Sequence, residues 1–229
     1  MAIAVVDTYT EEFTNSTGFT TADGVAVSGS NTLLFVAWLG AGSDPGDLTV
    51  VRDPGGEDSA LTEIRTDSSG SQAVSSIWYE IAPTAGTDLI AFDWSNASPK
   101  TGGIALYALS GVHQTTPISS NNGGGGFSGD PTVSISPGST DLCIDAAASS
   151  QDGLTADGTQ TPVLDTDVTN AAVGSSYRAG SGTSMDWTAD PGDDRWCASA
   201  AVIAEAAAGG GGLGIPIAMH HYKQIMGVN

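Results

Sequence analysis

Positively charged residues are scarce in this sequence. Only 6 Lys and Arg accompany 26 Asp and Glu, so the formal net charge at pH 7 is −20. An electrostatic field of this sign repels phosphate backbones and anionic lipid headgroups. The composition therefore predicts that the body of the protein has neither nucleic acid nor a membrane surface as a partner.

Long apolar segments are also missing. No stretch approaches the roughly 18 consecutive apolar residues that a transmembrane helix requires. Residues 1–7 contain no positive charge, and their apolar run ends at Asp7. Because a secretory signal peptide needs a positive start and a longer apolar core, we expect none here and expect the chain to be assembled in the cytoplasm.

Cysteine is nearly absent. The two cysteines, Cys143 and Cys197, fall in expected strands, and side-chain alternation allows both to lie on the same face of a sheet. There they form either a cross-strand disulfide or, as the more ordinary outcome, two separate buried thiols. No His or further Cys lies at ligand spacing from either thiol, so we expect no metal site and no cofactor.

Glycine, by contrast, is abundant. The chain has 31 Gly and only 14% charged residues, which is typical of many short strands joined by turns and not of long helices. The strongest strand is expected at 32–39, where a nearly unbroken apolar run follows the turn residues 28–31 and ends at Gly40. Such a run indicates a fully buried strand.

Several sequence patterns occur twice in the same order. The turn and strand at 28–39 correspond to those at 136–147, Ser75-Ser76 corresponds to Ser175-Ser176, and Phe92-Asp93-Trp94 corresponds to Met185-Asp186-Trp187. We therefore predict one β-sandwich domain over residues 1–205, built from related halves at about 20–112 and 130–205. Its paired sheets are expected to enclose a single interior that holds the Trp-bearing segments of both halves.

The same criteria predict the remaining strands. A run of four Gly within 121–126 is expected to form a flexible crossing between the halves, since no helix or Lys follows it in a phosphate-binding pattern. The predicted strands lie at 3–13, 19–27, 48–51, 60–66, 74–81, 88–94 and 104–109, and then at 132–136, 141–148, 161–168, 172–179, 183–188 and 196–205.

Catalytic patterns are weak. Asp93 and Asp186 resemble a glycosidase acid pair, but each lies between two large apolar residues, so alternation places both on the outward face of a repeated strand. His113 is isolated, and no Ser lies in a nucleophile-elbow pattern. The acidic turns at 44–47, 53–58 and 190–194 could supply oxygen ligands to calcium, but none matches a helix-flanked calcium loop. We therefore interpret them as ordinary turns. We expect no enzymatic activity.

The C-terminal segment differs from the rest of the chain. An Ala/Gly linker at 206–212 leads to residues 213–229, which contain no acid but do contain Lys223 and two of the three His. The segment is too apolar for a solvated end and too short for a core of its own. It either folds back onto its own sandwich or docks into a neighbouring subunit, including an identical copy. The predicted docking residues are Leu213, Ile215, Pro216, Ile217, Met219, His220, His221, Tyr222, Lys223, Ile225 and Met226.

One resemblance covers roughly residues 20–205. The segments that carry it are 76–79 with Pro83, Gly86 and Thr87, then 109–112, 114–117, 175–178, 185–188 and the strand that starts at Trp196. They resemble a widespread, mostly uncharacterised jelly-roll-like β-sandwich domain of tailed-phage structural proteins and bacterial extracellular proteins. Residues 214–222 are similar to short C-terminal ends of phage virion-associated proteins.

The resemblance implies a function as well as a fold. The fold it implies is an all-β, antiparallel sandwich of jelly-roll type with an extended C-terminal tail. The function it implies is that of a non-enzymatic virion structural protein: an accessory capsid or decoration subunit, or a tail component, anchored at the virion surface by its C-terminal peptide. Its partners would be other capsid or tail subunits and identical copies. The alternative is a carbohydrate-binding or adhesive module that contacts glycans on a host or cell surface.

Overall fold

The chain folds into antiparallel β-sheets. The computed structural model describes residues 2–41, 46–53, 56, 59–70, 72–96, 98, 100–151, 153–169, 171–189 and 195–206. Across these residues the secondary structure consists of strands, with no helix among the elements. The predicted all-β sandwich is therefore confirmed.

The first part of the chain forms two facing sheets. Their strands are β1 (Ala4–Ser16), β2 (Gly18–Thr20), β4 (Leu33–Ala41), β5 (Leu48–Arg52), β6 (Ser59–Ala60), β7 (Thr62–Ser69), β8 (Ala73–Ile81), β10 (Ile90–Trp94) and β11 (Lys100–Ser110). The larger sheet has the order β1-β11-β4-β8-β7, and the smaller has the order β2-β10-β5-β6. A separate short ladder joins β3 (Ala26–Val27) to β9 (Gly86–Thr87). Apart from the β5–β6 and β7–β8 connections, which stay within one sheet, the chain passes from one of these two sheets to the other, which is jelly-roll winding.

The second part of the chain repeats this arrangement. Its strands are β12 (Ile118–Phe127), β13 (Thr132–Ser134), β14 (Leu142–Ser149), β15 (Leu154–Ala156), β16 (Thr161–Val168), β17 (Ala171–Ala179), β18 (Ser184–Ala189) and β19 (Arg195–Ile203). The larger sheet has the order β12-β19-β14-β17-β16, and β13-β18-β15 form the smaller. Strand for strand, β12, β19, β14, β17 and β16 take the places of β1, β11, β4, β8 and β7. Each part is thus a jelly roll in its own right.

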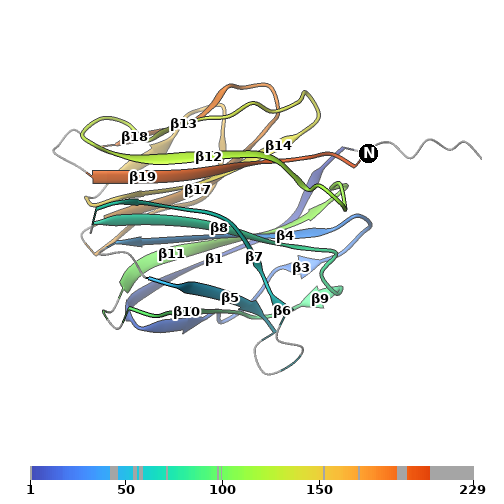
Figure 1. Cartoon of the computed structure of the whole chain (residues 1–229), viewed down its shortest axis with the longest axis horizontal. Helices are drawn as coiled ribbons and strands as arrows, with labels where there is room; N and C mark the ends of the chain where they lie inside the picture. The colour runs from blue at the N-terminus through green and yellow to red at the C-terminus, as the bar shows by residue number, and fades with distance from the viewer. Residues whose placement is uncertain are drawn as a thin grey trace, which may run out of the picture.

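The two jelly rolls stack through their larger sheets, which gives four layers (Figure 1). In this stack β1 contacts β16 and β12 contacts β7, so the two parts are related by an approximate two-fold exchange. One apolar cluster lies between the larger sheets and draws residues from both parts. A second lies inside the first jelly roll and a third inside the second.

The expectation of one shared interior is therefore wrong for the tryptophans. Trp38, Trp78 and Trp94 lie in the core of the first jelly roll, whereas Trp187 lies in that of the second. The physical reason is visible in β4. Leu33, Phe35, Ala37 and Leu39 face the shared cluster, while Leu34, Val36 and Trp38 face the smaller sheet. A strand that is apolar on both faces needs a layer on each side.

Residues 121–126 correct a second expectation. They do not form a flexible crossing but belong to β12, whose ladder with β19 runs from Ile118 to Phe127. The glycines allow close packing, because a Cβ on Gly126 would lie 2.7 Å from the ring of Trp196. The expected strand at 19–27 is also divided, into β2 and β3, and β15 was not anticipated.

Candidate functional site

The predicted docking residues, from Leu213 to Met226, lie outside the residues that the structure describes, as do His220 and His221. The structure does describe the residues that precede this segment, up to Ala206. The backbone N–H of Ala206 donates to the carbonyl of Gly111 at 2.8 Å, and Val112 forms a β-bridge with Glu205. The described part of the chain therefore ends beside the end of β11, close to the junction of the larger sheets.

A groove of about 440 Å³ opens at the same junction. One wall is Val5–Thr8 of β1, and the other is formed by Thr161–Val163 of β16 with Tyr177 of β17. Val5, Val163 and Tyr177 also pack against the shared cluster, so the floor of the groove continues that core outward. Val6 is 41% exposed and is one of the few large apolar side chains on the described surface.

Each wall of this groove contains a β-bulge. The β1–β11 register shifts between Val5 and Asp7, and the β16–β17 register shifts between Pro162 and Leu164. A bulge leaves one residue outside the ladder and bends the strand. These two bulges account for Val6 and Val163 facing the groove, and no sequence signal had marked either residue.

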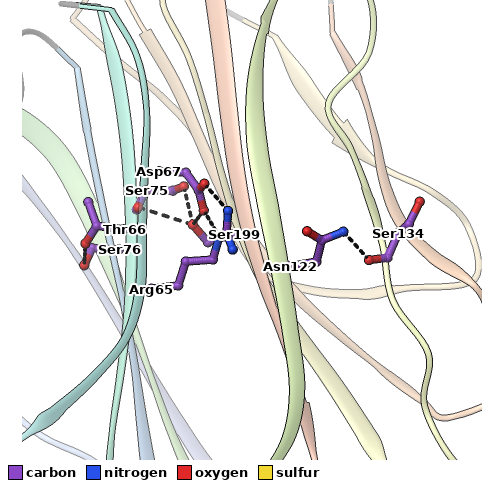
Figure 2. Close-up of polar contacts among 8 residues, drawn as sticks. All are labelled: Arg65, Thr66, Asp67, Ser75, Ser76, Asn122, Ser134 and Ser199. Carbon is purple, nitrogen blue, oxygen red and sulfur yellow. Dashed lines mark hydrogen bonds and ion pairs between the residues drawn. The ribbon is translucent and has the colours of Figure 1, made fainter.

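The approximate two-fold axis places β7 and β12 at the equivalent junction on the opposite side. Here the register shifts between Glu63 and Arg65, and between Ile118 and Ser120, match the two bulges of the groove. At this junction the two larger sheets are joined by polar side-chain contacts, whereas at the β1–β16 junction an apolar groove lies open (Figure 2).

Asp67 is the centre of those polar contacts. Arg65 donates to Asp67 through Nη2 at 2.7 Å, and Ser199 Oγ donates to Asp67 Oδ2 at 2.7 Å. Ser199 Oγ also lies 2.8 Å from Ser75 Oγ across the layers. A side chain at Gly123 would collide with both Arg65 and Asp67, so the glycine lets β12 approach this cluster.

A second polar cluster is fully buried in the second jelly roll. Asp145 Oδ1 accepts hydrogen bonds from the backbone N–H and the hydroxyl of Ser176, both at 2.8 Å, and its Oδ2 accepts one from Trp187 Nε1 at 2.7 Å. Burial raises the pKa of Asp145 to about 7, against the opposing effect of these donors. The cluster joins β14, β17 and β18, and it is enclosed by protein, so we assign it a structural role.

In the first jelly roll the equivalent position holds Trp38, because Ser76 pairs with Trp38 as Ser176 pairs with Asp145. No acceptor lies within hydrogen-bond distance of the indole N–H of Trp38 or of Trp94 among the described residues. The repeated halves therefore differ in polarity at this buried position. The sequence repeat alone had not indicated this difference.

The two cysteines lie on opposite faces of one sheet. Cys143 belongs to the core of the second jelly roll and Cys197 to the shared cluster, and both are free and buried. The common face that alternation allowed is not adopted, because Cys197 pairs with Ala148, which lies an odd number of residues from Cys143 on β14. Burial raises the pKa of each thiol to about 12.

The remaining candidates do not assemble into a site. Asp93 is exposed as predicted, and Asp186 is half-buried on the equivalent strand. The described residues contain no group of three or more His, Cys, Asp or Glu that could hold a metal ion. In the acidic turns, residues 44–45, 54–55, 57–58 and 190–194 lie outside the described part.

The tryptophans were expected to be mostly core, and Trp38, Trp78, Trp94 and Trp187 are buried. Of the aromatic side chains that the structure describes, only Phe127 is exposed, at 55%, and Arg195 lies 5.2 Å above the centre of its ring. Among the same residues there is no helix of a length and apolarity that would span a membrane.

Comparison with known proteins adds no assignment. Neither a scan against protein-family models nor a search of curated proteins finds a match to this chain. The features of the molecule that bear on function are the groove, the end of the described chain beside β11, and the composition of the C-terminal segment.

Proposed function

We propose that this chain is a non-enzymatic structural subunit of a tailed-phage virion, an accessory capsid or decoration protein or a tail component, attached by its C-terminal segment. The observation that carries the proposal is a contrast within the chain. Residues 213–229 have no acid, one Lys and two His, while the chain as a whole has a formal charge of −20. Such a segment complements an acidic neighbour, including an identical copy.

The body suits display on a particle. Its two jelly rolls share an apolar cluster between the larger sheets, so they form one unit instead of two tethered domains. Jelly rolls recur in viral capsid and lectin domains, which is support by analogy of fold. High negative charge keeps densely packed subunits soluble. The chain leaves this body at Ala206, beyond which the Ala/Gly linker gives the segment reach.

Deletion of residues 209–229 tests the proposal. In cells that produce particles, the full chain should sediment with them and the shortened chain should remain free. A full-length variant carrying Ile215→Asp and Ile217→Asp keeps the length of the segment but removes two of its apolar side chains, and it should also be lost from particles. Unchanged incorporation of both variants would contradict the anchoring function.

Glycan contact is the second candidate, and one feature favours it. A groove of about 190 Å³ between β12 and β13 is lined by hydroxyl and amide side chains that suit sugar hydroxyls, namely Ser120, Asn121, Asn122, Ser134 and Ser136, together with Ile135. Asn122 Nδ2 donates to the carbonyl of Ser134 at 2.9 Å across it (Figure 2).

Sugars commonly stack on exposed aromatic side chains. Among the described residues, Phe127 is the only exposed aromatic side chain. Asn121→Ala compared with the wild-type chain on a glycan array tests this second candidate. Specific binding that the substitution removes would favour it over the structural function.

A further inference from the structure

The groove between β1 and β16 leaves apolar surface open at the end of the shared core. Val5, Val163 and Tyr177 are half-buried against that core, and Val6 and Pro162 face solvent. The bulges on the two walls leave Val6 and Val163 outside their ladders. An occupant of the groove would extend the shared core by covering them.

The chain leaves the body close to this groove. Ala206 is hydrogen-bonded to Gly111, the residue after Ser110, and Ser110 pairs with Ala4 at the start of β1. Two strand spacings, roughly 10 Å, therefore bound the distance from Ala206 to the start of β1. Figure 1 shows the N-terminus and the end of β19 at the same end of the molecule.

The linker is long enough to cover the remaining distance. Residues 207–212 span at most about 20 Å when extended. Leu213 and the apolar residues that follow it can therefore reach the whole groove without any change in the body.

Charge favours the same pairing. Strands β1 and β16 carry five carboxylates, Asp7, Glu11, Glu12, Asp165 and Asp167, and no Lys or Arg, and Asp7 lines the groove itself; β17, which adds Tyr177, carries Arg178. The segment 213–229 carries Lys223, His220 and His221 and no acid. Its apolar side chains match the floor of the groove, and its cations match Asp7 and the acidic strands β1 and β16.

We propose that the groove between β1 and β16 holds residues 213–229 of the same chain while the protein is free, and releases them when the segment docks on a neighbour. The inference rests on the proposed function only in taking this segment as the docking element. Tethering gives an effective concentration of about 1 mM, so even an intrinsic affinity of about 100 µM would protect the amides of the segment about tenfold from hydrogen exchange.

Hydrogen exchange with mass spectrometry on the full chain tests the proposal. Val6→Lys places a positive charge in the groove, where it would repel a segment that carries Lys223 and no acid, and it should remove the protection of residues 213–229. Leu89→Lys is the matched control, because Leu89 is 40% exposed against 41% for Val6 but lies beside β10 in an outer layer. The control should keep wild-type protection. If Val6→Lys also changes exchange in β4, it has disturbed the fold. Thr161→Lys, on the opposite wall of the groove, is then the second groove variant and should likewise remove the protection of residues 213–229.

The dependence of protection on protein concentration distinguishes binding within one chain from binding between two copies. Protection that is constant over a hundredfold dilution and is lost only in the groove variants supports binding within one chain. An unprotected segment in the wild-type chain, protection that survives both groove variants, or protection that Leu89→Lys also removes would overturn the proposal. Protection that rises with concentration would assign the groove to the segment of a second copy and would equally overturn it. Because these experiments use free protein, failure here leaves particle incorporation unaffected.

Discussion

Substitution of Asp145 by Asn gives a prediction that can be worked through from the structure. Burial raises the pKa of Asp145 from 3.8 to about 7 in the folded chain, so folding takes up a proton between those pH values. The stabilisation is fully present below the unfolded pKa and is lost as pH rises through the folded pKa. Each pH unit in this window lowers the free energy of unfolding by about 1.4 kcal/mol. Ionisation of Asp145 therefore lowers it by up to about 4 kcal/mol between pH 4 and pH 7.

Asn keeps the shape of the side chain but does not titrate. Urea unfolding at intervals from pH 4 to pH 8 should therefore give a wild-type minus Asp145→Asn difference that falls by about 2 to 4 kcal/mol as pH rises and then levels off. Asp93→Asn removes the same charge from an exposed position on β10 and serves as the control. A difference curve for Asp145→Asn that is flat, or that rises with pH, would refute the reasoning.

Other substitutions test the packing between layers. Gly123→Ala should destabilise the chain by about 1 to 3 kcal/mol, because the new Cβ would collide with Arg65 and Asp67. Gly124→Ala is the control: no atom lies within 4 Å of its Cβ, so the urea midpoint should be nearly unchanged. Phe35→Ala should lower the free energy of unfolding by about 3 to 5 kcal/mol. Because Phe35 lies in the shared cluster, the substitution should also lower the hydrogen-exchange protection of β14 and β17 as well as β4. Loss of protection confined to the first jelly roll would contradict a shared core. Cys143 and Cys197 should not react with a thiol reagent in the native chain, and both should react in urea; rapid native labelling would show that they are not buried.

Strand positions were largely predictable from the sequence because apolar runs and turn residues mark them locally. Expected strands at 161–168 and 172–179 correspond to β16 and β17 within a residue. β12 escaped prediction because glycine has low strand propensity. Its stability comes from the β19 ladder and from the neighbours that fit against its bare backbone, and no window of sequence contains those neighbours.

The number of layers was harder to predict. The unbroken run Leu33–Leu39 signals a strand covered on both faces, and a two-layer sandwich provides only one covered face per sheet. A stack of four sheets satisfies that pattern. Which face each cysteine occupies depends on strand register, which the sequence does not specify.

The groove was not predictable from the sequence either. It depends on single-residue bulges in β1 and β16 and on the contact between strands that are more than a hundred residues apart in the chain. The C-terminal segment could be recognised because its composition changes abruptly after the Ala/Gly linker. The surface that would receive it could be found only in three dimensions.

Cross-linking of purified particles tests the anchoring claim most directly. Lys223 is the only lysine in residues 213–229, so an amine-reactive cross-linker reports the surroundings of the segment through this side chain. We expect Lys223 to be linked to another virion protein or to a different copy of this chain. Particles that lack the chain, or that contain it with Lys223 linked only to its own body, would contradict the account.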